Sequence, residues 1–242
     1  MGDRRPQCEV APARTGAIVV VVGLLVVANV MSNRVLPAAA YVPWNLAIAS
    51  VLLVVARREV RDDELGLGEW RRGAAFGGVL AVATLLVMLV ALAMPVFHQL
   101  FEDRRVDDNA AEVVFQALIR VPLGTVLLEE LAFRSVLPAM FARRVGVLRA
   151  SVIASVLFGL WHVLPAWHLN ESNEAAGEVF GSGAIGTLVT VVFGVVGTTI
   201  AGLWWCWIRV RARSILATML AHTASNSIGY LLAYAVMRSR AA

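Results

Sequence analysis

Long apolar stretches separated by short polar connections dominate the 242-residue chain. Several stretches reach the roughly 20 residues that a helix needs to cross the hydrocarbon core of a bilayer. The pattern predicts an all-α fold, a polytopic transmembrane helix bundle with about seven spans and room for one extra interfacial or re-entrant helix. The expected spans cover residues 16–31, 38–56, 73–98, 110–141, 147–166, 183–208 and 213–237.

The connections between these stretches are too short to fold alone, so residues 1–242 are expected to form a single membrane domain. The charged segment 57–72 is expected to lie at the membrane interface. The polar, glycine-containing segment 170–182 is predicted to be the longest loop on its side of the membrane. The first apolar run, 16–31, is interpreted as a retained helix rather than a signal peptide, because the apolar pattern continues immediately after it.

Composition agrees with this class. The chain is 59% hydrophobic with a mean hydropathy of +0.75, which is too apolar for a soluble domain of this size. Its net charge of +4 is ascribed to membrane topology, so membrane lipids are expected as partners and nucleic acid is not. Two cysteines, Cys8 and Cys206, supply neither a disulfide framework nor a cysteine metal motif.

The arginines are distributed unevenly along the chain. Fourteen lie in the N-terminus and the connections 57–72, 143–149 and 209–213, whereas five lie in the alternate connections and the C-terminus. Because positive residues accumulate on the cytoplasmic side, the distribution predicts a multi-pass protein of the cell (plasma) membrane with a cytoplasmic N-terminus. With seven spans the C-terminus would lie outside, and an additional segment would reverse that side.

The sixth expected span carries small residues at every fourth position, a pattern that lets a second helix approach closely. This stripe consists of Gly186, Thr190, Gly194, Thr198 and Gly202. The same span ends in three tryptophans beside an arginine, which predicts an interfacial aromatic belt. These residues are Trp204, Trp205, Trp207 and Arg209.

Polar residues at membrane depth are the most informative feature of the chain. Glu129 and Glu130 lie side by side in the fourth span, with Arg134 four residues after the second acid. A charged side chain there costs about 2.5 kcal/mol or more on insertion scales, so a functional role is the default expectation. Glu130 and Arg134 share a helical face and are expected to form a buried ion pair, whereas Glu129 lies about 100° away around the helix.

Two later spans carry comparable pairs. Phe158 and His162 lie four residues apart in the fifth span, and His222 and Asn226 lie four residues apart in the seventh. Each pair therefore shares one helical face.

The depths of these residues can be compared along the helices. Glu129 lies 17 residues before a plausible turn at Gly146 and His162 lies 16 residues after it. At 1.5 Å per residue both are about 24–26 Å from the turn, so an antiparallel hairpin would place them at nearly the same level. His222 lies only about 16 Å from the turn near Arg211. Its level agrees only if the hairpin protrudes further into the cytoplasm.

The three motifs, in this order on successive apolar segments, resemble the CPBP (CAAX protease and bacteriocin-processing) family of intramembrane proteases. This family is also called Abi and includes the type II CAAX prenyl endopeptidases. The resemblance covers residues 110–230 as a catalytic core, and residues 1–109 match only as generic N-terminal transmembrane helices. The motifs are Glu129-Glu130-x-x-x-Arg134, Phe158-x-x-x-His162 and His222-x-x-x-Asn226.

The resemblance implies a hydrolase, an endopeptidase that cleaves a peptide or membrane-protein substrate near the membrane surface. Hydrolysis needs a water deprotonated near neutral pH, and Glu129 is the expected general base, with His162 sharing or orienting that water. His222 and Asn226 are expected to stabilise the developing oxyanion. The alternative role for Glu129 is a simple hydrogen bond to another helix. The alternative role for Asn226 is a polar clamp between helices.

Three further residues are expected to support the site. Arg134 and Glu130 would be structurally essential as a buried pair, because removal of one leaves an uncompensated charge. Binding of a substrate carboxylate is the second interpretation for Arg134, and a catalytic contribution from Glu130 stays open. Phe158 is expected to shape the floor of the cleft. Arg120 receives no role.

A metal cofactor is an open alternative. Glu129, His162 and His222 offer one carboxylate and two imidazoles, a donor set adequate for Zn²⁺ or another divalent metal with water as fourth ligand. The family is often labelled metalloprotease. A metal-free glutamate mechanism is equally plausible, and the chain has no His-Glu-x-x-His motif.

Two other function classes compete with a protease. The first alternative is a non-catalytic membrane scaffold or bacteriocin-immunity protein that keeps the polar cluster for packing. The second alternative is a transporter, since intramembrane ionisable residues also mark ion pathways. The sequence shows no paired inverted halves with broken helices, which weakens the transporter hypothesis. The sequence identifies neither the substrate nor the oligomeric state.

Overall fold

The computed structural model describes residues 11–101, 106, 109–167 and 169–241, and this part of the chain contains helices and no strand. Six helical stretches are long and apolar enough to cross a membrane, and they coincide with the first six predicted spans. They are Thr15–Val35, Ala38–Arg57, Asp62–Ala93, Ala110–Val145, Val147–Ala166 and Gly183–Ala212. The predicted polytopic all-α bundle is confirmed.

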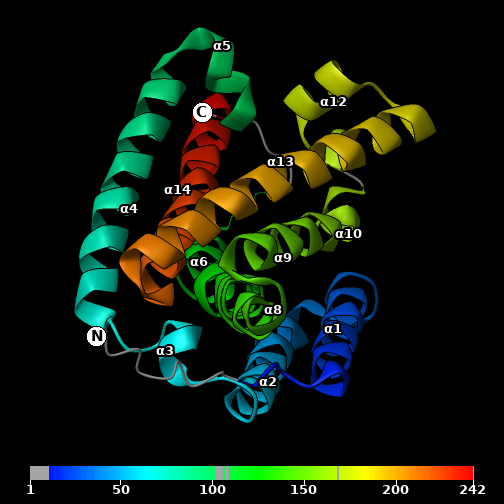
Figure 1. The fold of residues 1–242 in the computed structure, drawn as a ribbon. Helices are drawn as coiled ribbons and strands as arrows, with labels where there is room; N and C mark the ends of the chain where they lie inside the picture. Colours follow the sequence, from blue (N-terminus) through cyan, green and yellow to red (C-terminus); the bar gives the residue numbers. More distant parts are fainter. Residues whose placement is uncertain (1–10, 102–105, 107–108, 168, 242) are drawn as a thin grey trace.

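The first half of the chain supplies three of these spans (Figure 1). Its elements are α1 (Thr15–Val30), a π-helical turn η1 (Met31–Val35), α2 (Ala38–Arg57), α3 (Asp62–Leu65), α4 (Trp70–Ala93), α5 (Pro95–His98) and η2 (Gln99–Phe101).

The second half supplies the helices that carry the motifs. The fourth span runs through α6 (Ala110–Phe115), η3 (Gln116–Val126), α7 (Leu127–Glu130), η4 (Leu131–Val136) and α8 (Leu137–Val145). The remaining elements are α9 (Val147–Trp161), α10 (Val163–Ala166), α11 (Leu169–Ser172), α12 (Glu174–Phe180), α13 (Gly183–Ala212) and α14 (Ile215–Ala241).

The seventh predicted span corresponds to α14, which packs along α4 (Figure 1). It is a continuous helix of 27 residues but does not count among the six most apolar stretches. The polar residues between His222 and Ser227 interrupt its apolar pattern. These residues include the candidate site residues His222 and Asn226. The polarity of the site, and not the length of the helix, therefore distinguishes α14 from the six apolar stretches.

The turn predicted at Gly146 is confirmed. Gly146 has φ = 81°, a left-handed value that favours glycine, and it separates α8 from α9. The two helices pack against each other as an antiparallel hairpin. With α1 and α2 they enclose the main apolar core, which places the middle of the fourth span at the centre of the bundle.

The arginine-rich connections meet at one end of the bundle. The Arg143 guanidinium lies 2.6 Å from the Glu64 carboxylate, and the backbone carbonyl of Glu64 accepts a hydrogen bond from Arg209. Arg72 donates a hydrogen bond of 2.8 Å to the carbonyl of Arg211. The connections 57–72, 143–149 and 209–213, which the arginine distribution assigned to one side of the membrane, therefore lie together in the fold.

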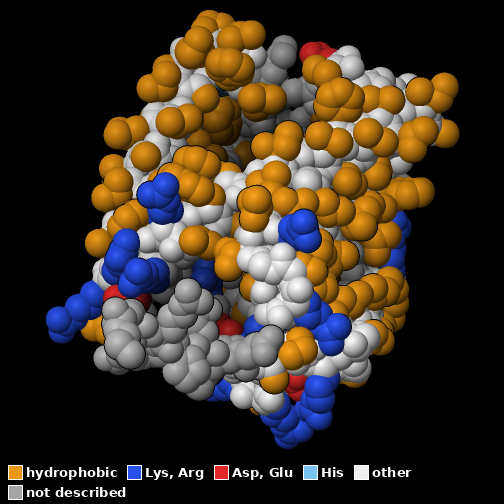
Figure 2. Space-filling view, viewed as in Figure 1, with side chains coloured by type: hydrophobic (Ala, Val, Ile, Leu, Met, Phe, Trp, Pro, Cys, Tyr) orange, Lys and Arg blue, Asp and Glu red, His pale blue; other side chains and the backbone are white. Residues whose placement is uncertain are grey.

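Figure 2 shows apolar side chains over α4 and α13 and a concentration of basic side chains around the lower part of the molecule, near α3. Large exposed hydrophobic residues include Val79 and Val87 on α4 and Ile185 and Leu188 on α13. Such a surface suits contact with lipid. The side of the membrane that the basic end faces stays a prediction, and Arg4, Arg5, Arg104 and Arg105 lie outside the described residues.

The small-residue stripe of the sixth span has the predicted packing role. A Cβ atom added at Gly202 of α13 would lie 3.1 Å from Cβ of Ser155 on α9. A Cβ at Gly194 would lie 3.2 Å from Cβ of Ala166 on α10. Helix α13 thus approaches α9 and α10 through positions without side chains, as a small-residue interface requires.

The prediction of a loop over 170–182 is wrong in most of its length, since α11 and α12 occupy it. The Asn173 side chain accepts a hydrogen bond from the backbone of Ala176 and caps α12. Asn170 is buried, and its amide donates to the carbonyl of Gly181 at 3.1 Å. Asparagine and serine favour both turns and helix caps, so polarity alone did not distinguish the two.

Candidate functional site

Glu129 and Glu130 lie in α7, a short α-helical stretch between the π-helical segments η3 and η4. Pro122 lies within η3 and Pro138 follows η4. Each proline lacks the N–H of an α-helical hydrogen bond, which accounts for the altered winding nearby. Both acids are buried, with exposed fractions of 6% for Glu129 and 0% for Glu130.

Glu130 has two cationic or proton-donating neighbours. Its Oε1 lies 2.8 Å from Nδ1 of His222 and 3.5 Å from Nη1 of Arg134. The predicted ion pair between Glu130 and Arg134 is therefore present, and both side chains are fully buried. The pair is joined to α14 through His222, a link that the sequence did not indicate.

Arg134 lies over an aromatic ring. Its Cζ is 3.8 Å from the ring centroid of Phe158, a favourable cation–π arrangement. None of its three guanidinium nitrogens has a hydrogen-bond partner among the described residues. Phe158 therefore stabilises the guanidinium in addition to filling space.

His222 is held between the two acids. Because Glu130 faces Arg134 and accepts as a carboxylate, Nδ1 of His222 carries the proton of their hydrogen bond. Nε2 then faces Glu129, 3.8 Å from its Oε2. The imidazole also stacks on Trp205, with the ring centroids 6.1 Å apart and the planes 17° apart. These contacts determine the orientation of the ring.

Glu129 differs from its neighbour in its partners. Its Oε1 accepts a hydrogen bond of 2.9 Å from the indole Nε1 of Trp161. Among the described residues no arginine forms an ion pair with Glu129. Trp161 directly precedes His162, so the hairpin places Glu129 at the level that the residue spacing predicts.

His162 terminates α9 and is partly exposed. Its Nδ1 lies 2.8 Å from the carbonyl oxygen of Phe158, and its ring packs edge-on against that side chain with centroids 4.5 Å apart. Within the described residues no hydrogen bond or ion pair joins His162 to Glu129. A water shared by the two residues stays a prediction.

Phe158 is the residue around which the motif side chains gather. In addition to Arg134 and His162, its ring contacts His222 at a centroid distance of 6.4 Å and Phe133 at 5.3 Å. The fourth, fifth and seventh predicted spans thus meet at one aromatic side chain.

Asn226 lies one helical turn beyond His222 on α14, and its side chain is exposed. Its Oδ1 accepts a hydrogen bond of 3.4 Å from the hydroxyl of the adjacent Ser225. The structure does not bring Asn226 into contact with the acids.

Residues 111–228 match the family model described as Rce1-like, type II CAAX prenyl endopeptidase. This match, over just under half of the chain, supports assignment of this segment to the CPBP/CAAX protease family. The matched range includes every motif residue and extends from α6 into α14. No curated protein and no solved structure matched in the corresponding comparisons. The family match and the six apolar helices support a CAAX-protease-like membrane peptidase.

The three residues considered as metal ligands are Glu129, His162 and His222. In the described part of the chain, no group of three or more His, Cys, Asp or Glu side chains is arranged to hold a metal ion. Nδ1 of His222 is engaged by Glu130, and Nδ1 of His162 lies against a backbone carbonyl. Metal-binding histidines commonly make such contacts through the other ring nitrogen, so a metal at these residues stays a prediction.

Two tryptophans of the family segment have contacts at the site that the sequence did not indicate. Trp161 donates to Glu129, and the available signal was an indole N–H at the depth of an acid, which needs a partner when buried. Trp205 was assigned to an interfacial belt but packs inward on His222. Its neighbours Trp204 and Trp207 are exposed and stack with centroids 5.0 Å apart, as a belt requires.

Arg120 also acquires an explanation within the fourth span. Its Nη1 donates a hydrogen bond of 3.0 Å to Gln116, and its Cζ lies 4.4 Å from the ring centroid of Tyr41. The guanidinium is thus solvated by an amide and an aromatic face, which stabilises a cation at membrane depth.

Proposed function

We propose that the chain is an intramembrane endopeptidase in which Glu129 is the general base. One observation carries the proposal: of two adjacent buried acids, Glu130 faces Arg134 and His222, whereas Glu129 has no arginine partner among the residues that the structure describes. A general base must keep its carboxylate available to a substrate water. The separate pairing of Glu130 supports this division of roles.

The proposed reaction is hydrolysis of one peptide bond. Glu129 removes a proton from water, and the resulting hydroxide forms a bond to the carbonyl carbon of the substrate. The carbonyl electrons move to oxygen and give a tetrahedral oxyanion. When the oxyanion collapses, the C–N bond breaks and the proton held by Glu129 passes to the leaving nitrogen. One water is consumed, and one carboxyl and one amino terminus are produced.

His222 is proposed to stabilise negative charge in this reaction as an imidazolium, in which Nδ1–H donates to Glu130 and Nε2–H is a second donor. Its orientation is set by Glu130 on one side and by Trp205 on its face, while Nε2 points towards Glu129. A group prepositioned beside the reacting carboxylate needs little reorganisation as the oxyanion develops. The Glu130–Arg134 pair acts through His222 and is a positioning element.

His162 and Asn226 are proposed to contribute once substrate is bound. The Nδ1–H of His162 donates to the Phe158 carbonyl, which leaves Nε2 as an acceptor able to orient the attacking water. Asn226 lies on the same face of α14 as His222 and is accessible as a second donor to the oxyanion. Catalytic contacts often tighten only in the substrate complex.

The test compares cleavage of a fluorogenic peptide library by purified, bilayer-reconstituted wild type, Glu129→Gln and His162→Ala. The Glu129→Gln variant is expected to lose about 10²–10⁴-fold in kcat/KM, the typical contribution of a general base. Glu112→Gln is the matched control, because Glu112 lies in the same span but bonds to Gln116 away from the site. Undiminished cleavage by correctly folded Glu129→Gln would refute the assignment.

A further inference from the structure

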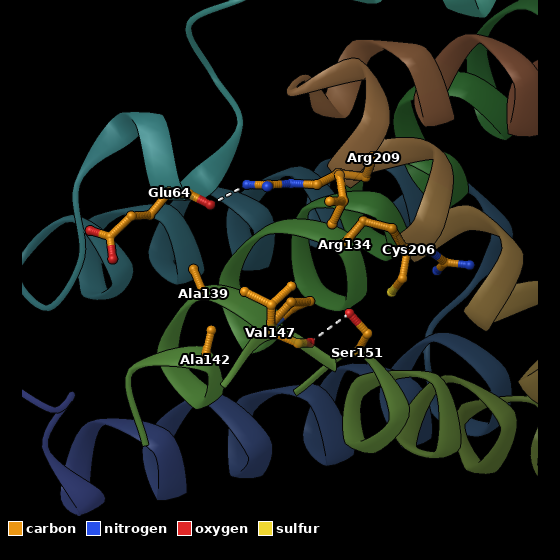
Figure 3. Close-up of a pocket in the computed structure, with 10 residues that line it drawn as sticks. Glu64, Arg134, Ala139, Ala142, Val147, Ser151, Cys206 and Arg209 are labelled. Carbon is orange, nitrogen blue, oxygen red and sulfur yellow. Dashed lines mark hydrogen bonds between the residues drawn. The ribbon is translucent and has the colours of Figure 1, made fainter. Parts of the chain in front are cut away.

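Charged side chains line a cavity at the arginine-rich end of the bundle (Figure 3). Glu129 is not among the residues that line it. The cavity has a volume of about 190 Å³ and is formed between α3, α8, α9 and α13. Its walls are largely apolar and include Pro138, Ala142, Val147 and Val210.

Two arginines line this cavity, Arg134 and Arg209. Arg134 is 1% exposed, and none of its guanidinium nitrogens has a hydrogen-bond acceptor among the described residues. Its carboxylate neighbour Glu130 lies 3.5 Å away and is shared with His222. The donor capacity of this buried cation is therefore largely unused.

Arg209 has no carboxylate partner in the described part of the chain. Its Nη2 donates to the backbone carbonyl of Glu64, and its Nε has no acceptor among the residues that the structure describes. The Glu64 carboxylate instead binds Arg143 at 2.6 Å, and Figure 3 shows it turned away from Arg209. The Glu64 carboxylate therefore does not neutralise the charge of Arg209.

A partly buried cation without a carboxylate partner, Arg209, and the unused donors of buried Arg134 are costly to leave unsatisfied, which indicates that a ligand supplies acceptors and negative charge. We propose that the cavity binds a phosphate-type oxyanion through Arg209 and Arg134. Guanidinium groups suit phosphate because their donors are planar and permanently charged. The apolar walls suit a phosphate ester, and the arginine-rich end is where lipid headgroups would lie. The proposal does not depend on the catalytic role of Glu129.

The experiment measures thermal unfolding of the delipidated, detergent-solubilised full chain. One arm titrates inorganic phosphate against chloride at equal ionic strength, and the other titrates dioctanoyl phosphatidic acid. Because a ligand that binds only the folded state raises its stability, a saturable rise in the unfolding midpoint is expected in at least one arm. A response to phosphatidic acid alone assigns a lipid phosphate, and a response to both assigns the oxyanion itself.

The decisive variant is Arg209→Gln, which keeps a donor near Glu64 and removes the charge. Its apparent Kd is expected to rise about tenfold or more, the typical consequence of losing a charged hydrogen bond. Arg211→Gln is the control, since Arg211 lies two residues away on the same helix, is exposed and does not line the cavity. Ala142→Leu keeps both arginines but fills the cavity, so it should also abolish the response.

The proposal is overturned if wild type shows no saturable shift with either probe. It is also overturned if Arg211→Gln weakens binding as much as Arg209→Gln, because the effect would then be one of general surface charge. Should Arg209→Gln fail to fold, the response of Ala142→Leu decides: retained binding in that variant contradicts the cavity.

Discussion

The indole Nε1 of Trp161 donates a hydrogen bond of 2.9 Å to Oε1 of Glu129, joining α9 to α7 across the hairpin. The oxygen that remains, Oε2, lies nearest to His222. Trp161 therefore sets which carboxylate oxygen is presented to the rest of the site. This relationship makes Trp161 a positioning residue for the proposed base.

Replacing Trp161 with phenylalanine tests this relationship. The ring and most of its packing remain, but the donor to the Glu129 carboxylate is lost, so kcat/KM is expected to fall about tenfold, the value of a charged hydrogen bond. Trp204→Phe is the matched control because Trp204 is exposed at 52% and stacks on Trp207, away from Glu129. Equal activities of the two folded variants would contradict the positioning role.

The buried pair Glu130–Arg134 predicts a strong effect on stability. Arg134→Met leaves Glu130 buried beside His222 without its arginine, and removal of one partner of a buried pair typically costs about 3–5 kcal/mol. Denaturant unfolding in detergent measures the loss. Adding Glu130→Gln to that variant is expected to recover part of it, because no unpaired carboxylate remains. Simple additivity of the two single changes would argue against coupling.

The close approach of α9 and α13 predicts position-dependent sensitivity to volume. Gly202→Val places side-chain atoms against Ser155 and is expected to destabilise the fold by about 1–3 kcal/mol, as overpacking does. Gly197→Val introduces the same change on the same helix, where a Cβ would meet nothing within 4 Å. Thermal unfolding should therefore distinguish the two variants, and a similar loss in both would place the helix contact elsewhere.

The proposed chemistry predicts that peptide cleavage survives exhaustive chelation. Each step needs only a carboxylate base, a water and polar groups of the protein, and the candidate ligands do not form a three-residue group in the described chain. Activity is measured after treatment with a strong chelator and again after adding Zn²⁺. Loss that Zn²⁺ restores would show that the site reassembles around a metal during catalysis.

The local features of this fold could be predicted well from sequence. The first six spans, the Gly146 turn and the ion pair between Glu130 and Arg134 follow from apolar run length, glycine conformation and four-residue spacing. The exceptions are instructive. Segment 170–182 folded into short helices because its polar residues cap them, and Trp205 turned inward because one residue along a helix rotates a side chain by about 100°.

Contacts between helices were harder to predict. Glu129 and His162 were expected at one level and to share a water, and the register of the hairpin agrees, but the direct partner of Glu129 is Trp161. A difference of one residue changes which side chain faces α7, while it changes the depth by only about 1.5 Å. The residue spacing therefore predicted the depth of each side chain along its helix, but not which side chain faces the neighbouring helix.

By itself the sequence determined the membrane class, the course of the spans and the set of polar residues that require a partner, because these depend on hydropathy and on spacing within a single helix. Only the tertiary structure decided that Glu130 meets His222 while Glu129 receives Trp161, and that Arg209 meets a backbone carbonyl instead of a carboxylate. Those partners lie on different helices. Their contacts depend on helix rotation and packing distance, which no single stretch of sequence specifies.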